Sequence, residues 1–166
     1  MVKAILMVGN VGSGKGTWIK KFLSEHTDEK WAVVSKDALR FMLGGGRYIF
    51  DPEVFEPYID YVAKEMISDL LDDEINIIVD ETNVDAVQRA DIIELIWDDV
   101  KTIAVVMPVI DKNESMLRKS KPETDYGYSI KTWEGVWERK NGKYVEPHEY
   151  EGFDEIILVE KDWRTK

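Results

Sequence analysis

The sequence predicts a single α/β domain in which a five-stranded, mainly parallel sheet carries helices on both faces. Two observations support this fold class. Short apolar runs rich in β-branched residues alternate with longer amphipathic stretches, which is the pattern of repeated βαβ units. The length of 166 residues, 44% of them hydrophobic, suits one domain with one core. We therefore assign residues 1–166 to one domain.

Each predicted strand is an apolar run of the kind that is buried on both faces of a parallel sheet. In chain order the strands are Ala4–Val8, Trp31–Ser35, Asn76–Asp80, Thr102–Val109 and Glu155–Glu160. Helical spacing predicts the helices Lys15–Glu25, Pro52–Leu71, Ala86–Trp97 and Asn113–Lys119. The glycines at 44–46 break the chain between two helical segments. Because open α/β sheets bind ligands at the carboxyl ends of their strands, we looked for functional residues there.

Composition excludes several classes of function. The chain has no cysteine, which rules out disulfides, thiolate metal sites and cysteine nucleophiles. With 33 acidic and 22 basic residues the net charge is −11, so a broad basic surface for nucleic acid is not expected, although a local basic cleft could bind a strand end. The run 1–8 is too short and too polar at its start for a signal or membrane helix. We expect a cytoplasmic protein without membrane attachment.

The strongest motif is Gly9-Asn10-Val11-Gly12-Ser13-Gly14-Lys15-Gly16-Thr17, which follows the first strand and opens a helix. It matches the Walker A phosphate loop except that Gly16 stands where Ser or Thr is usual. Backbone N–H groups of such a loop bind phosphate oxygens, and its lysine reaches the outer phosphates. We predict binding of the phosphates of ATP by Gly12, Ser13, Gly14, Lys15, Gly16 and Thr17. Either Thr17 is a direct ligand of Mg²⁺, or the ion is held through water and phosphate. The motif predicts a P-loop NTPase fold.

A second candidate site opens the helix after the second strand, in the segment 35–40. Asp37 and Arg40 are three residues apart and so share one face of a helix. Asp37 could accept a proton from an attacking hydroxyl while Arg40 holds a phosphate group. The alternative is structural, because Ser35 or Asp37 could cap the helix and Arg40 could be a solvated charge.

The third candidate, Asp80-Glu81-Thr82-Asn83, follows the middle strand. Asp80 is placed like a Walker B acid, which orients Mg²⁺ or its water, and Glu81 or Asn83 could supplement it. Acids after a strand also cap helices, and this alternative remains open.

The fourth candidate is a basic cluster at 118–121 in an acidic chain. Arg118 and Lys121 could close over the phosphates as part of a lid at about residues 111–130, with Pro122 at its hinge. A solvated helix face is the competing interpretation.

The order of these motifs resembles the kinase domain of the phage polynucleotide kinase family, a group of P-loop kinases. The similar segments are Gly12–Trp18, Lys36–Arg40, Val79–Asn83, Glu146-Pro147 and Glu151–Asp154. The resemblance implies that Asp37 is the general base, that Arg40 contacts a phosphate or the transition state, and that Lys15 and Thr17 bind the nucleotide. A second lid arginine of the family falls at Lys121-Pro122 here, so Lys121 is its candidate replacement.

The resemblance implies an ATP- and Mg²⁺-dependent kinase with catalytic residues Lys15, Asp37 and Arg40, whose acceptor is the 5′-hydroxyl of a polynucleotide. Another hydroxyl is the alternative acceptor, on a hydroxymethylated base in DNA, a nucleoside or a small metabolite. A module that only hydrolyses nucleotide is the third choice, and no guanine-reading NKxD motif supports it, since Asn113 precedes Glu114. The aromatic residues Tyr126, Tyr128, Trp133 and Trp137 could stack on bases, but core packing explains them better.

Overall fold

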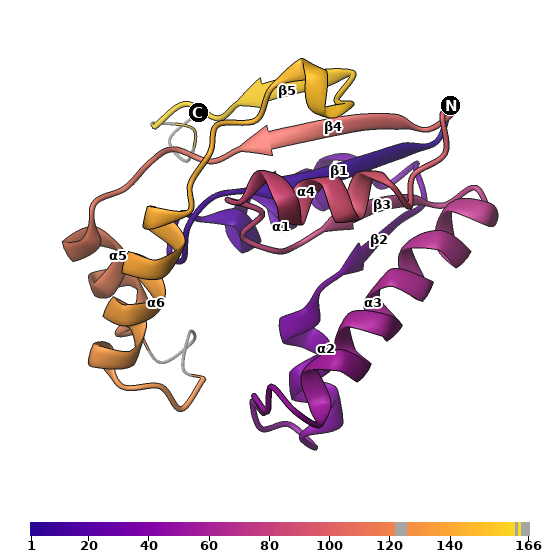
Figure 1. The fold of residues 1–166 in the computed structure, drawn as a ribbon. Coiled ribbons are helices and arrows are strands. Elements are labelled where there is room, and N and C mark those ends of the chain that lie inside the picture. Colours follow the sequence, from indigo (N-terminus) through magenta and orange to yellow (C-terminus); the bar gives the residue numbers. More distant parts are fainter. Residues whose placement is uncertain (122–125, 162, 164–166) are drawn as a thin grey trace.

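The structure is a computed structural model that describes residues 1–121, 126–161 and 163. Within these residues five strands form one sheet in the order β2-β3-β1-β4-β5, and all neighbouring pairs are parallel. The strands are β1 (Lys3–Val8), β2 (Trp31–Val34), β3 (Asn76–Val79), β4 (Lys101–Val106) and β5 (Glu155–Leu158). Because the strands are parallel, the loops after β1, β2 and β3 meet at one edge of the sheet (Figure 1). The predicted fold class is confirmed.

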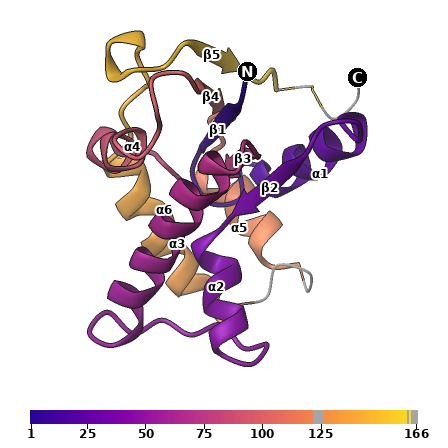
Figure 2. The same cartoon turned by 90° about the vertical axis from the view of Figure 1, so that its right-hand side faces the viewer.

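Helices cover both faces of the sheet (Figures 1 and 2). Their bounds are α1 (Lys15–Glu25), α2 (Lys36–Leu43), α3 (Phe55–Asp72), α4 (Ala86–Ile93), α5 (Lys112–Lys119) and α6 (Ile130–Gly142), with a 3₁₀ turn η2 (Glu149–Glu151). In the central strand β1, alternate side chains enter two separate cores, as the two-residue period of a strand requires. Ile5 and Met7 pack with Ile19 of α1, whereas Leu6 and Val8 pack with α3 and α4 on the other face.

Several element boundaries differ from those predicted, for local reasons. The fourth strand ends at Val106 rather than Val109, because Pro108 has no N–H to donate to a neighbouring strand. The third helix begins at Phe55 because the Asp51 carboxylate accepts from the N–H groups of Glu53 and Val54 in a turn. Helix α4 ends at Ile93, beyond which the chain makes tighter turns. Helix α6 was not predicted as an element.

A buried arginine ties three late segments together. Arg89 of α4 is fully buried and makes two hydrogen bonds to Glu151, at 2.7 and 2.8 Å. Its remaining nitrogen donates to the carbonyls of Asn83 and Val145, both at 3.0 Å. The Glu151–Asp154 segment therefore has a structural role: it neutralises Arg89 and fixes the chain before β5 and the loop after β3.

Candidate active site

The phosphate loop is shaped by glycines in backbone conformations that other residues rarely adopt. Gly12 and Gly14 have φ angles of 73° and 106°. A Cβ atom on Gly12 would lie 2.8 Å from Oγ and 3.1 Å from Cα of Ser115 in α5. The Ser115 hydroxyl also donates to the carbonyl of Val11 at 2.8 Å. The curl of the loop and its contact with α5 therefore both depend on a missing side chain at position 12.

Helix α1 presents an open amino terminus to this loop. Gly14 precedes it in the left-handed conformation, no side chain caps it, and its first turn contains no acid. By contrast α2, α4, α5 and α6 are each capped by a serine or aspartate side chain. The first N–H groups of α1, together with its helix dipole, therefore form a ready site for an anion such as a phosphate group.

Lys15 lies inside the curl of the loop. Its ammonium group donates to the carbonyls of Gly9 and Asn10 at 2.9 and 3.2 Å. Burial lowers the pKa of Lys15 below its ordinary value, while the carboxylates of Asp80 and Glu81 oppose the shift. This position lets the cation reach either the loop or a phosphate bound within it.

The loop after β3 lies against both the phosphate loop and α2. The N–H of Gly9 donates to the carbonyl of Thr82 at 2.8 Å, and the carboxylate of Glu81 accepts from the N–H of Lys36 at 2.7 Å. Asp85 caps the following helix, so Asp80 and Glu81 are not used as caps. Burial raises the pKa of both carboxyl groups above the ordinary range. Asp80 is thus available for chemistry beside the phosphate loop, whereas Glu81 already accepts from the first N–H of α2.

Asp80 suits a magnesium site better than Thr17 does. The carboxyl of Asp80 is largely buried and interacts electrostatically with Lys15, where a metal-bound phosphate would lie. Thr17 is exposed in the first turn of α1. Among the described residues no group of three or more His, Cys, Asp or Glu side chains could hold a metal by itself. The donor set thus fits an ion bound mainly by phosphate and water, with Asp80 beside it.

Asp37 and Arg40 meet on α2, as their spacing predicted. Ser35 caps this helix, so the carboxylate of Asp37 is not used as a cap. Arg40 donates to Asp37 at 2.6 Å and makes two hydrogen bonds to Glu56 of α3, at 2.8 and 2.6 Å. Burial would lower the pKa of Arg40, but its bonds to Glu56 hold it above the ordinary value. The guanidinium is therefore a buried cation, not a solvated one, positioned by two carboxylates.

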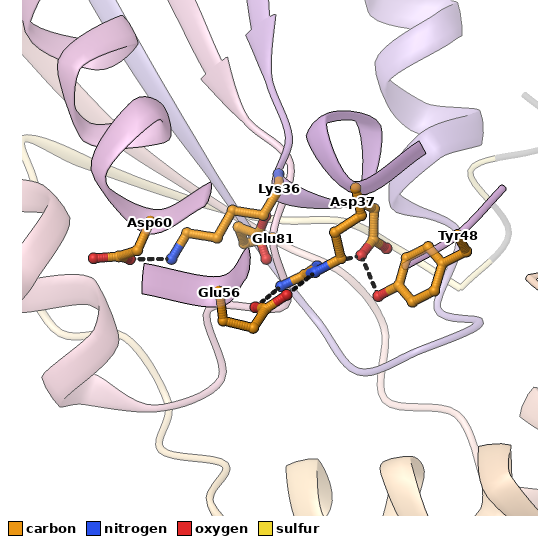
Figure 3. Close-up of polar contacts among 7 residues, drawn as sticks. Lys36, Asp37, Tyr48, Glu56, Asp60 and Glu81 are labelled. Carbon is orange, nitrogen blue, oxygen red and sulfur yellow. Dashed lines mark hydrogen bonds and ion pairs between the residues drawn. The ribbon is translucent and has the colours of Figure 1, made fainter. Parts of the chain in front are cut away.

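Tyrosines from separate segments enclose Asp37. The hydroxyl of Tyr48 donates to Asp37 at 2.9 Å, as Figure 3 shows, and Tyr126 interacts electrostatically with the same carboxylate. The rings of Tyr48 and Tyr126 stack, with centroids 4.8 Å apart. Burial, followed by the charge of Asp37, raises the pKa of both hydroxyls. Asp37, whose side chain is 40% exposed, thus lies beside a neutral hydrogen-bond donor and one cation.

The aromatic residues after α5 are mainly core residues, as the sequence favoured. Trp133 is 4% exposed and packs with Val11 and Met116, while Trp137 borders the same cluster. Tyr126 and Tyr128 lie at the edge of this cluster, where both rings contact Trp133. The cluster joins α5 and α6 to the phosphate loop.

The basic residues at 118–121 have different surroundings, which the sequence did not reveal. Arg118 donates to the carbonyl of Gly12 at 2.8 Å and to Glu114 at 2.7 Å, so it supports the phosphate loop from its side. Lys121 is exposed. Lys119 instead lies over the rings of Tyr126 and Trp133, at 4.7 and 4.0 Å from their centroids.

Lys119 interacts electrostatically with the carboxylates of Asp37 and Asp80. Burial lowers its pKa to about 8, with the charge of Lys15 as the next cause, and Asp37 and Asp80 oppose the shift. Of the proposed lid, residues 122–125, including Pro122, lie outside the described residues. The lid itself stays a prediction.

Sequence reasoning missed Tyr48, Glu56 and Lys119. Lys119 could have been found, because it lies four residues after the buried Ser115 and three after Met116, on one face of α5. The pattern was hard to read because Leu117, an apolar residue, is 64% exposed and so does not mark the buried face of α5. Tyr48 and Glu56 carry no local signal, since each reaches α2 from a different segment.

Comparison with known proteins adds the family context. A family described as an AAA domain matches residues 5–146 of this chain. Among solved structures, a chain of the Pnkp1/Rnl/Hen1 RNA repair complex has a TM-score of 0.67 at 23% identity, with 87% of this chain and 46% of that chain covered. A fungal RNA kinase has a TM-score of 0.57 at 17% identity, with 96% and 75% covered.

A gluconokinase from Sinorhizobium meliloti 1021 has a TM-score of 0.55 at 14% identity, with 95% of this chain and 81% of that chain covered. Our chain spans less than half of the chains matched in the two Pnkp1/Rnl/Hen1 structures. No significant match was found among curated proteins. These likenesses at low identity establish the P-loop kinase-like fold. In the part of the chain that is described, no helix is both long and apolar enough to span a bilayer.

Proposed function

Since the chain belongs to the AAA domain family that matches residues 5–146, we propose that it is an ATP-dependent kinase that phosphorylates the 5′-hydroxyl of a polynucleotide. The proposal combines a phosphate loop for the donor with an acid for the acceptor. It assigns Gly12–Thr17 to the phosphates of ATP and Asp37 to the acceptor hydroxyl.

One observation carries the proposal, which is the position of Asp37 relative to the phosphate loop. The charge of Asp37 affects the pKa of Lys15, Asp80 and Lys119, so these four groups, which come from four segments, lie within electrostatic range of one another. A protein that only hydrolyses ATP needs no acceptor site, because water attacks the terminal phosphate. A carboxylate enclosed by tyrosines and an arginine instead suits an acceptor that brings its own hydroxyl.

The chemistry follows from these positions. Asp37 accepts the proton of the acceptor hydroxyl as its oxygen bonds to the γ-phosphorus, and the bond from that phosphorus to the bridging oxygen of ADP breaks. Lys15 and the N–H groups at the start of α1 hold the phosphates of the donor. Arg40, and Lys119 from α5, stabilise negative charge on the transferred group or on an acceptor phosphate. Bound Mg²⁺ would neutralise phosphate charge, with Asp80 holding it or its water.

The polynucleotide acceptor rests on sequence resemblance and on two structural neighbours, which are named for RNA repair and RNA kinase. A strand end needs only a local cleft, so the net charge of −11 does not oppose it. The same charge favours the second candidate, a kinase for another hydroxyl, on a hydroxymethylated base, a nucleoside or a small metabolite. The gluconokinase neighbour supports that alternative.

The test supplies ATP labelled in the γ-phosphate together with three acceptors: a 5′-hydroxyl oligonucleotide, a hydroxymethylated duplex and a panel of nucleosides and sugars. We expect label to appear first on the oligonucleotide. Transfer to another acceptor alone would replace the first candidate by the second. Release of labelled phosphate without transfer to any acceptor would overturn the kinase assignment.

A further inference from the structure

A pocket of about 190 Å³ lies between α3 and α4, at the carboxyl ends of β2 and β3. Its floor is apolar and consists of Val34, Ala63, Ile67, Val79 and Ile92. Lys36, Asp60 and Gln88 are among the polar residues around it. Neither the phosphate loop nor Asp37 lines the pocket.

A buried polar atom in the lining of this pocket has no hydrogen-bond partner among the described residues. Asn83 is 0% exposed, and its side-chain amide nitrogen donates to the carbonyl of Met7 at 2.9 Å. That bond fixes the orientation of the amide, so the oxygen is the atom left without a partner. A buried acceptor of this kind is costly unless a bound molecule donates to it. The lining of the pocket therefore includes one acceptor that no described residue satisfies.

Other acceptors stand near the same space. Glu81 lines the pocket, and one of its carboxylate oxygens accepts from the N–H of Lys36. Asp60 accepts from Lys36, as Figure 3 shows, and from Lys64, and with Glu81 and Asp91 the lining holds three carboxylates against these two lysines. With the cations paired, the polar groups that remain select a neutral molecule that donates hydrogen bonds.

The size of the pocket limits what can occupy it. An apolar cavity of about 150 Å³ accommodates benzene, so one of 190 Å³ admits a six-membered ring with one or two small substituents. An apolar floor with a few polar groups at one end favours a ring that is flat and has N–H groups on its edge. Among the components of a nucleic acid, a pyrimidine fits this description.

We propose that the pocket between α3 and α4 binds a pyrimidine base of the acceptor, with an N–H group of the base donating to Asn83. This rests on the proposed function for the identity of the acceptor. Glu81 lies between Lys36, at the pocket, and Asp37, as Figure 3 shows. A base in the pocket and a hydroxyl at Asp37 would thus belong to one bound molecule that passes Glu81.

The first experiment measures binding without catalysis. With a non-hydrolysable ATP analogue saturating the phosphate loop, the protein is titrated by NMR with 1-methyluracil and with 1,3-dimethyluracil, which differ only in the N3–H donor. We expect 1-methyluracil to shift the side-chain amide signals of Asn83 and to bind at least about tenfold more tightly. Equal binding of the two compounds, or none at millimolar concentration, overturns the inference.

The second experiment fills the pocket. Ala63→Leu adds side-chain volume at the floor, while Ala90→Leu makes the same change at an exposed position of α4 outside the lining. We expect Ala63→Leu to weaken 1-methyluracil at least about tenfold, and Ala90→Leu to have no effect. If Ala63→Leu does not fold, Gln88→Ala, at a partly exposed position of the lining, replaces it, with a loss of at least about threefold expected.

The kinase assay separates this inference from the proposed function. The pocket predicts that Ala63→Leu slows transfer to oligonucleotides with a 5′-terminal pyrimidine and spares those with a purine. If the rate of transfer depends neither on the terminal base nor on the Ala63→Leu substitution, the pocket assignment is overturned and the kinase assignment stands. Pyrimidine binding without transfer to any acceptor supports the pocket and overturns the kinase.

Discussion

The phosphate loop and the acceptor side of the cleft are built in different ways. The loop is one run of nine residues, 9–17, and its shape depends on glycine conformations and on the start of the helix that follows. The proposed acceptor side consists of Asp37, Tyr48, Glu56 and Glu81, which come from four separate segments. A site made of backbone groups can be recognised in a short stretch of sequence. A site made of side chains from distant segments exists only after folding.

The largest expected effect tests whether the two sides are functionally separate. Asp37→Asn removes the proposed base without changing the size of the side chain. We expect kcat to fall about 10²–10⁴-fold, while the Kd for ATP changes less than about twofold because the phosphate loop is untouched. Label transfer to the best acceptor and calorimetric titration with an ATP analogue measure the two quantities. Normal transfer by Asp37→Asn would remove the general-base role.

The next effect belongs to the loop and compares two of its glycines. Gly12→Ala places a Cβ against Ser115 at a φ of 73°, which costs about 1–3 kcal/mol. We expect this to weaken ATP binding about 5–150-fold, measured by calorimetry. Gly16→Ala is the matched control, because no atom lies within 4 Å of its Cβ. Equal losses in both variants would contradict a loop shaped by Gly12.

A pH dependence joins the two sides through Lys119. The pKa of this group is about 8, so its charge is lost as the pH rises through that value. If the cation stabilises the transferred group, kcat/KM for ATP falls about tenfold per pH unit above pH 8. Lys119→Arg should abolish this fall, because a guanidinium keeps its charge, whereas Lys121→Arg should retain it.

Stability gives an independent check on that profile. The folded-state pKa of Lys119 is below its ordinary 10.5, so between about pH 8 and 10.5 the folded protein binds fewer protons than the unfolded chain. The contribution of Lys119 to the free energy of unfolding therefore rises with pH in this window. If activity falls with rising pH while the urea midpoint does not, the loss of activity is not due to unfolding. A fall that is unchanged in Lys119→Arg would exclude Lys119 as its source.

The smallest expected effect concerns the enclosure of Asp37. Tyr48→Phe removes the hydroxyl that donates to Asp37 and keeps the ring that stacks on Tyr126. We expect the free energy of unfolding to drop by about 0.5–1.5 kcal/mol, as measured by urea denaturation. Tyr58→Phe, at an exposed position of α3, is the control and should leave stability unchanged. A Tyr48→Phe variant as stable as the native chain would show that this hydrogen bond adds nothing.

Sequence patterns predicted the elements of the fold better than their ends. The apolar runs located all five strands, since a strand buried on both faces must be apolar throughout. Helix α6 was missed because most of its residues other than Trp133 and Trp137 are polar. It is held by packing against α5 and the phosphate loop, which no pattern within its own sequence specifies.

The sequence by itself determined the phosphate loop, the fold class, and the pairing of Asp37 with Arg40 on one helical turn. Each of these depends on residues that are close in the chain, where glycine conformation, strand burial and helical spacing act directly. Tertiary structure decided the rest: that Glu56 holds Arg40, that Lys119 interacts with Asp37 and Asp80, and that Asn83 borders a pocket. These contacts join segments far apart in the chain, and they arise only when packing fixes which side chains share a buried space.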